Sequence, residues 1–254
     1  MKIVEAEERR LFLASSSYVS GKGYLEHCIE AMVNFLGSDI KTLCFIPFAA
    51  VAAPKDQKKV WAEYTEKPKQ AFAKFGIEVC SAHEHNVPYF RVKQAEALFI
   101  GGGNTFHLLY YLYELGLVEA IRENYLSGIP IMGVSAGTNV LCPTIMNTND
   151  MPIMEVLTLE AAGLLNFQIN PHYIDPGPKS AHQGETRPAR IAEYHKINTL
   201  PVLGLREGSW LRYQNGKLML EGATGAKMFC RNLDPFEYSQ GCDLTIHQTF
   251  HSRE

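Results

Sequence analysis

The sequence lacks any long apolar run. In its 254 residues it nowhere has the roughly 18 consecutive apolar residues that a membrane-spanning helix needs. The first ten residues, MKIVEAEERR, also contain no apolar core of signal-peptide length. We therefore expect a cytoplasmic protein without a membrane partner.

The sequence also lacks an excess of charge of either sign. It has 24 Lys and Arg residues against 27 Asp and Glu residues, for a net charge of -3. The basic residues are scattered and form no stripe of the kind that binds nucleic acid. We expect no nucleic-acid partner and a small molecule or short peptide as the ligand.

Closely spaced cysteine pairs of the metal-binding type are missing as well. The 6 cysteines are widely dispersed, which argues against a zinc site or a disulfide framework. His83-Glu84-His85 lacks the spacing of a His-Glu-x-x-His zinc helix, and we interpret it as a solvated loop. No metal and no cofactor is expected.

No Pro/Gly/Ser-rich linker divides the chain, so residues 1–254 are predicted to form one domain. Short apolar runs alternate with amphipathic stretches, a pattern typical of an α/β fold with a mostly parallel sheet and helices on both faces. Gln214-Asn215-Gly216 predicts a hairpin turn, and the tail from about Asn232 is left unassigned. The predicted strands are 11–14, 42–46, 97–100, 130–133 and 202–205, and the predicted helices are 25–36, 60–75, 105–115, 118–126 and 188–195.

The segment Gly133-Val134-Ser135-Ala136-Gly137 follows an apolar strand and leads into a helix-compatible stretch. This layout is typical of a nucleophile elbow, in which a sharp turn between strand and helix exposes a serine hydroxyl and small neighbours let the backbone approach. A small-residue turn after a buried strand is also common without catalysis. The identification of Ser135 as a nucleophile therefore depends on the residues that accompany it.

Gly101-Gly102-Gly103-Asn104-Thr105 also joins a strand to a helix. It fits neither a Gly-x-Gly-x-x-Gly motif nor a P-loop, which argues against nucleotide binding. Amides of Gly102 and Gly103, together with that of Ala136, are candidates for an oxyanion hole. Asn104 or Thr105 would at the same time cap the following helix.

A serine nucleophile needs a base and a group that orients the base. His172 is the favoured base because it follows an apolar strand and a proline that would end the strand's ladder. Asp150, in a polar loop, and Glu207, directly after a buried strand, are both candidates for the orienting carboxylate. The sequence alone does not choose between them.

Taken together, these segments resemble peptidase E, the α-aspartyl dipeptidase family of serine peptidases. The resemblance runs in the family's order from about residue 100 to residue 210. The matching segments are FIGGGNTF at 99–106, GVSAG at 133–137, CPTI at 142–145, TNDMPI at 148–153, INPH at 169–172, GETR at 184–187 and REGSW at 206–210.

The resemblance implies a class I glutamine-amidotransferase-like, flavodoxin-like α/β fold and cleavage of dipeptides that begin with aspartate. By position it makes Ser135 the nucleophile, His172 the general base and Asp150 or Glu207 the orienting acid. Arg187 would bind the aspartyl carboxylate of the substrate, with Asn104 in the same binding site. No cofactor is implied, and a homodimer is left open.

Three residues depart from the family pattern. Val134 and Thr138 flank the nucleophile with side chains of a different size, and Arg206 stands where the family often has proline. We expect Arg206 to pair with Glu207 and draw it away from His172, which favours Asp150 as the orienting acid. A general esterase of the α/β-hydrolase type and a catalytically silent binding protein are the alternative functions, since the chain order Ser135, Asp150, His172 also suits an α/β-hydrolase.

Overall fold

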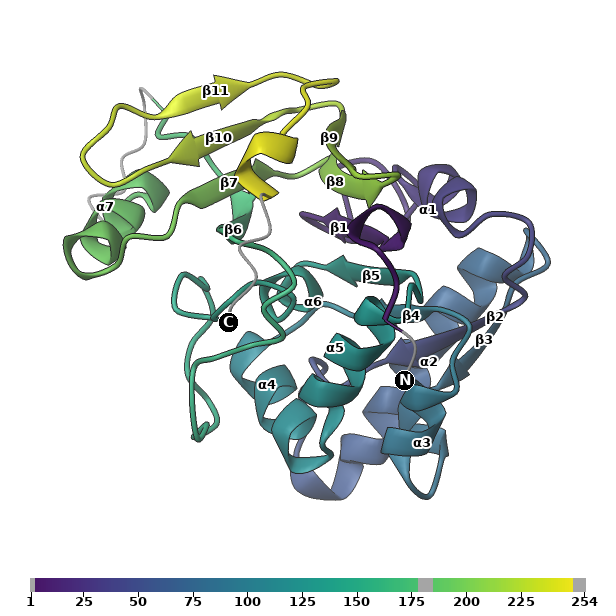
Figure 1. The fold of residues 1–254 in the computed structure, drawn as a ribbon. Helices are drawn as coiled ribbons and strands as arrows, with labels where there is room; N and C mark the ends of the chain where they lie inside the picture. The colour runs from purple at the N-terminus through teal and green to yellow at the C-terminus, as the bar shows by residue number, and fades with distance from the viewer. Residues whose placement is uncertain (1–2, 178–184, 249–254) are drawn as a thin grey trace.

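The computed structural model describes residues 3–177 and 185–248, and its strands form two sheets (Figure 1). The larger sheet has 7 strands in the order β3-β2-β4-β5-β1-β8-β9, and the smaller has 4 in the order β11-β10-β7-β6. The strands are β1 Leu11–Ala14, β2 Thr42–Ile46, β3 Glu78–Ser81, β4 Leu98–Ile100, β5 Ile131–Val134, β6 Gln168–Tyr173, β7 Val202–Arg206, β8 Ser209–Gln214, β9 Lys217–Gly222, β10 Ala226–Phe229 and β11 Phe236–Tyr238.

Strands β3, β2, β4, β5 and β1 of the larger sheet run parallel, and β8 and β9 add antiparallel pairs at one edge. The predicted α/β fold with a mostly parallel sheet is therefore confirmed. Because side chains alternate along a strand, Leu11 and Leu13 face one apolar cluster and Phe12 and Ala14 the other. Both faces of this sheet are thus buried, which explains why its strands have nearly continuous apolar sequences.

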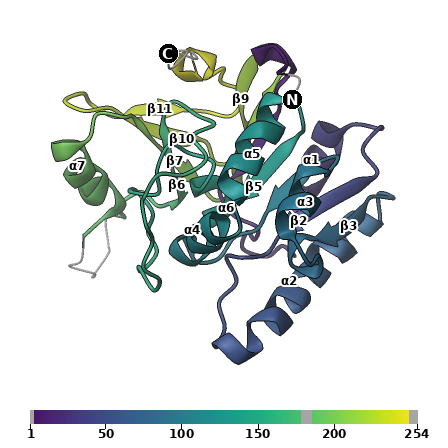
Figure 2. The ribbon, with the colours of Figure 1, turned by 60° about the horizontal axis from the view of Figure 1, so that its bottom comes forward.

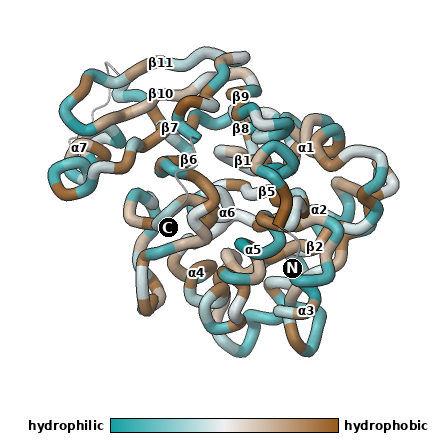
Figure 3. The backbone as a smooth tube through the Cα atoms, viewed as in Figure 1, coloured by the Kyte–Doolittle hydropathy of each residue, from teal (hydrophilic) through white to brown (hydrophobic). Residues whose placement is uncertain are grey.

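Helices cover the two faces unequally. Met32 and Phe35 of α1 pack with Phe12, whereas residues of α3, α4 and α5 pack with Leu11 and Leu13 on the opposite face. Figure 3 shows hydrophilic and hydrophobic residues alternating along α3 and α7, as expected of helices with one exposed face. The helices are α1 Ile29–Leu36, α2 Gln57–Ala73, α3 Pro88–Lys93, α4 Thr105–Glu114, α5 Leu117–Leu126, α6 Ala136–Asn139 and α7 Arg187–Ile197, and the 3-10 turns are 6–8, 54–56, 82–84 and 245–248.

The smaller sheet was not anticipated. The strand predicted at 202–205 is found as β7, but it pairs with β6 and β10 rather than with the strands of the larger sheet. Figures 1 and 2 both show β6, β7, β10 and β11 to one side of the larger sheet, with α7 beside them. Part of the unassigned tail contributes as well, since Phe236–Tyr238 forms the edge strand β11.

Local sequence signals explain several boundaries. Asn215 and Gly216 have φ values of 53° and 72°, the left-handed conformation that a tight hairpin between β8 and β9 requires. Asn104 caps α4 by accepting a hydrogen bond from the His107 amide at 3.0 Å. The predicted hairpin and the predicted cap are both confirmed. Among the described residues, no helix is long and apolar enough to cross a membrane.

Candidate active site

Ser135 lies in the turn between β5 and α6, where the sequence predicted a nucleophile elbow. Its backbone has φ 54° and ψ -116°, a conformation that costs a residue with a side chain of order 1–3 kcal/mol. The turn is tight because α6 lies against the end of β4: a Cβ atom on Gly137 would lie 2.1 Å from the Ile100 carbonyl oxygen. Only glycine fits there, so the sequence motif reflects a real close approach.

His172 lies within β6. Pro171 does not end the strand, as the sequence predicted it would, because β6 resumes its pairing with β7 at Tyr173. His172 also has a positive φ, of 53°. The pairing of β6 with β7 is irregular between Asn170 and Tyr173, at the position of His172. This irregularity turns the imidazole toward the elbow, and its Nε2 lies 2.9 Å from Ser135 Oγ. The serine and histidine predicted from the sequence are thus within hydrogen-bond distance.

Glu207 follows β7 directly, and its Oε1 lies 2.5 Å from His172 Nδ1. A carboxylate only accepts hydrogen bonds, so Nδ1 carries the proton, and Nε2 is left to accept the hydrogen bond from the Ser135 hydroxyl. Both side chains are partly open to solvent, with exposed fractions of 37% for His172 and 48% for Glu207. The main chain of Glu207 is held by Thr224, whose hydroxyl donates to its carbonyl oxygen at 2.6 Å.

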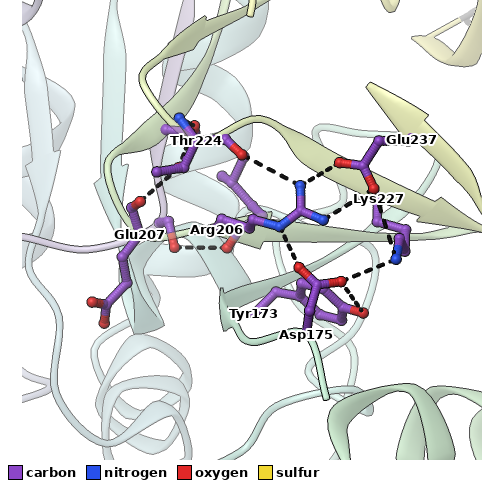
Figure 4. A network of polar contacts seen from close by, with 10 residues as sticks. Tyr173, Asp175, Arg206, Glu207, Thr224, Lys227 and Glu237 are labelled. Carbon is purple, nitrogen blue, oxygen red and sulfur yellow. Dashed lines mark hydrogen bonds and ion pairs between the residues drawn. The ribbon is translucent and has the colours of Figure 1, made fainter. Parts of the chain in front are cut away.

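The expected pairing of Arg206 with Glu207 is wrong. Arg206 instead donates to Asp175 Oδ2 at 2.7 Å and forms a two-point contact with Glu237 on β11 (Figure 4). Successive side chains of an extended segment point in opposite directions, so Arg206 faces β10 and β11 while the carboxylate of Glu207 points away from this network. Arg206 therefore does not weaken Glu207 as a partner of His172.

The Arg206 network is strongly charged. The Arg206 guanidinium holds the pKa of Asp175 at about 2, against the opposing effect of burial, and Lys227 adds a further contact at 3.0 Å. Hydrogen bonds to Glu237 and Asp175 raise the pKa of Arg206 in turn. This network ties β7 to β10 and β11 immediately before Glu207, and so fixes the strand that carries the carboxylate.

Asp150 lies elsewhere in the site. Its Oδ2 accepts hydrogen bonds from the amide of Thr105 at 2.8 Å and from the Thr105 hydroxyl at 2.5 Å. A carboxylate at the first turn of α4 is favourable because the helix N-terminus is partially positive. Of the two candidate acids, the structure places Glu207 against His172 and Asp150 against the start of α4.

The glycine loop lies close to the nucleophile. A Cβ atom on Gly102 would lie 3.0 Å from the Ser135 Cβ, and one on Gly103 would lie 2.2 Å from the Ala49 carbonyl oxygen. Burial raises the pKa of Tyr64 to about 12, and the Gly102 backbone opposes this rise. Ala136 is the first residue of α6, so its amide has no acceptor within the helix.

Ser15 is a contributor that the sequence analysis missed. Its buried hydroxyl donates to the Leu205 carbonyl at 2.8 Å and accepts a hydrogen bond from the His172 amide at 2.9 Å. One side chain at the end of β1 thereby connects the larger sheet to both strands that carry the histidine and the glutamate. The signal was the polar run Ser15-Ser16-Ser17 directly after an apolar strand.

Arg187 begins α7, and its surroundings link it to Asp150. Burial lowers the pKa of the guanidinium, Arg190 lowers it further, and the Asp150 carboxylate opposes both effects. Asn104 has both ends of its amide occupied, by His107 and by the Met151 carbonyl at 2.9 Å. Gly184, which precedes Arg187 in the matching segment, lies outside the described residues.

A cavity of about 1000 Å³ opens in front of these groups. Ser135, His172, Glu207 and Asp150 line it together with residues 102–104. Residues 49–51 and residues of the loop 16–22 and of α2 line it as well. Arg187 is not among its lining residues. Over the described ranges, no cluster of three or more histidine, cysteine, aspartate or glutamate residues could hold a metal ion.

Comparison with known proteins agrees with this geometry. The family model described as Peptidase family S51 matches residues 11–220. A Peptidase E from Streptomyces coelicolor is 45% identical over 235 residues, covering 92% of this chain and 93% of the relative. A probable alpha-aspartyl dipeptidase from Drosophila melanogaster is 42% identical over 243 residues, covering 95% and 98% of the two chains.

Solved structures show the same fold. The structure of a peptidase from an acI-B1 Actinobacterium has a TM-score of 0.67 at 20% identity and covers 93% of this chain and 96% of its own. A putative peptidase E from Listeria monocytogenes has a TM-score of 0.63 at 20% identity, covering 85% and 99%. The matched region contains the elbow, the histidine and the glutamate described above, and the chain belongs to peptidase family S51.

Proposed function

We propose that the protein is a serine dipeptidase that hydrolyses dipeptides with an N-terminal aspartate. The observation that carries this proposal is the line of hydrogen bonds from Ser135 Oγ to His172 Nε2, 2.9 Å, and from His172 Nδ1 to Glu207 Oε1, 2.5 Å. Its relatives named peptidase E and alpha-aspartyl dipeptidase support the substrate class.

In the first step, His172 Nε2 takes the proton of the Ser135 hydroxyl as Oγ attacks the carbonyl carbon of the aspartyl residue. Glu207 keeps the Nδ1 proton in place and stabilises the imidazolium that forms. The amides of Gly103 and Ala136 face the developing oxyanion, with Gly102 shaping the loop beside it. Of the three residues predicted for the oxyanion hole, Gly103 and Ala136 are thus proposed as donors and Gly102 as part of the loop that positions them.

In the second step, the imidazolium gives its proton to the leaving amine, the peptide bond breaks, and the aspartyl group remains as an ester on Ser135. Water then enters, His172 takes a proton from it, and hydroxide attack on the ester releases aspartate. The proton returns to Ser135 Oγ. Every step uses only groups of this chain, the substrate and water.

Specificity for aspartate is assigned to Arg187. A guanidinium offers a planar pair of donors that matches a carboxylate, and a site built in this way rejects neutral side chains, which leave the donors unpaired. We assign Asp150, which lines the cavity and whose charge raises the pKa of Arg187, to orienting the guanidinium or to facing the α-ammonium of the substrate. In this proposal Asp150 acts in binding, and Glu207 orients the base.

The proposal is tested by measuring release of free aspartate from Asp-Leu, with Glu-Leu, Asn-Leu and Ala-Leu as matched substrates. We expect cleavage of Asp-Leu alone, and a loss of about 100-fold or more in kcat/KM for Arg187→Ala. Arg190→Ala is the control, because Arg190 lies on the same helix and pairs with Glu185 at 3.7 Å. Equal turnover of all four dipeptides, or an unchanged Arg187→Ala, would contradict the assignment.

A further inference from the structure

The part of the cavity beyond the catalytic residues includes two lysines among its lining residues. Lys22, on the loop after β1, and Lys67, on α2, both line it, whereas the carboxylates Asp150 and Glu207 line the part around Ser135. The proposed mechanism uses neither lysine. The wall formed by α2 and the loop 16–22 therefore carries two lysines and one carboxylate, Glu63, and the proposed mechanism uses none of the three.

Lys67 is held over two aromatic rings. Its Nζ lies 5.6 Å from the ring centre of Tyr18 and 5.8 Å from that of Tyr64, both within the range of a cation–π contact. The hydroxyl of the same Tyr64 reaches the glycine loop, where a Cβ atom on Gly101 would lie 2.8 Å from it. One tyrosine side chain therefore separates the ammonium group from the loop that faces Ser135.

No carboxylate neutralises Lys67 in the described part of the chain. The nearby acidic residue on α2 that lines the cavity, Glu63, pairs instead with Lys59 at 3.8 Å. An ammonium group that is placed by aromatic rings, open to a cavity and without an anionic partner is suited to bind an anion of the ligand.

The substrate class supplies that anion. A dipeptide that begins with aspartate has two carboxylates besides the reacting carbonyl. One is the aspartyl side chain, assigned to Arg187, and the other is the free carboxylate of the residue that leaves. We propose that Lys67, with Lys22 as a second cation of the same wall, forms a subsite for the carboxylate of the leaving residue. This inference rests on the proposed function and extends it by assigning a binding residue to the second carboxylate of the substrate.

The subsite has a direct consequence for substrate length. In a dipeptide the free carboxylate belongs to the residue next to the scissile bond, whereas in a tripeptide it lies one residue further away. An interaction with Lys67 thus favours the shorter substrate. A neutral amide in place of the carboxylate loses the same interaction while the rest of the substrate stays unchanged.

The experiment compares Asp-Leu, Asp-Leu-amide and Asp-p-nitroanilide as substrates of the wild type and of Lys67→Gln. We expect Lys67→Gln to raise KM for Asp-Leu about tenfold, the loss of one charge-assisted hydrogen bond, and to leave the amide and the anilide within about twofold. Lys67→Arg should restore the preference for the free acid. Lys74→Gln, at the C-terminal cap of α2 and outside the cavity, is the matched control.

Binding gives a readout that needs no turnover. In calorimetry with the Ser135→Ala variant, Asp-Leu should bind more tightly than Asp-Leu-amide, and adding Lys67→Gln should abolish the difference. Equal effects of Lys67→Gln on acid and amide, or no preference in the parent protein, would overturn the subsite. Failure of the wild type to cleave Asp-Leu itself would count against the proposed function, whereas cleavage of Asp-Leu, its amide and the anilide with equal efficiency would count against the subsite alone.

Discussion

The two sheets make different contributions to the site. The larger sheet supplies Ser135 and the glycine loop at the ends of β5 and β4, each within a short contiguous segment. The smaller sheet supplies His172 and Glu207, which come from two strands and are 35 residues apart. The nucleophile is therefore formed locally, whereas the base and its acid need the pairing of β6 with β7. All three groups meet only when the two sheets are docked against each other.

Loss of the nucleophile should have the largest effect on activity. Ser135→Ala removes the group that attacks the substrate, and we expect kcat to fall by about 10⁴-fold or more. The fold should survive, since the Ser135 side chain contributes no hydrogen bond other than that with His172 in the described residues. Steady-state kinetics and a thermal unfolding curve check both points, and near-normal turnover would exclude Ser135 as the nucleophile.

The two candidate acids are separated by a paired substitution. Glu207→Gln should lower kcat by about 10³- to 10⁴-fold, because His172 loses the carboxylate that fixes its tautomer. Asp150→Asn keeps the shape of the contact with Thr105 and should lower kcat about tenfold at most, with the larger change in KM. Measuring kcat and KM for both variants decides which carboxylate orients His172. A larger loss of kcat in Asp150→Asn than in Glu207→Gln would show that Asp150 is the orienting acid.

The connection between the sheets can be weakened at Ser15. Ser15→Ala leaves the His172 amide and the Leu205 carbonyl without this partner, at a cost of about 1–3 kcal/mol, and Tm should fall by several degrees. We expect kcat to fall with it, because His172 loses its anchor. Ser38→Ala, at an exposed serine, is the control. An unchanged Tm together with an unchanged kcat would show that the sheets are held without Ser15.

The smallest effect concerns acid stability of the smaller sheet. The pKa of Asp175 is lowered to about 2 from 3.8. The contribution of its carboxylate to the free energy of unfolding is therefore nearly complete above about pH 4 and is lost as the pH falls toward 2. Asp175→Asn should therefore reduce the difference in unfolding free energy between pH 5 and pH 3. The effect is below about 1 kcal/mol, because the side chain is 41% exposed. Urea titrations with Asp234→Asn as control measure it.

Much of the larger sheet could be predicted because its signals are local. A buried parallel strand has a short apolar sequence, and a strand–turn–helix with glycine and serine is visible in five residues at Ser135. The sequence also predicts His172 as the base, although β6 continues through Pro171 and the histidine and does not end before them. The resemblance to peptidase E added the order of the segments, and the family is confirmed.

Strand partners could not be predicted in the same way. Apolar periodicity identifies 202–205 as a strand but does not say which sheet it joins, since that depends on contacts far along the chain. For the same reason Arg206 was assigned the wrong partner: Asp175 and Glu237 reach it only through the pairing of β7 with β10 and of β10 with β11. The identity of the acid beside His172 therefore required the tertiary structure.

The hydroxyl of Ser15 also bears on how the protein acquires activity during folding. It bonds to His172, 157 positions further along the sequence, and to Leu205, 190 positions further along. The site therefore needs contacts that close long loops at a high entropic cost. A chain emerging from the ribosome would carry its serine elbow long before it carried Glu207. Hydrolytic competence would then appear only in the last phase of folding, and the nascent chain would remain inert toward surrounding peptides until it was nearly complete.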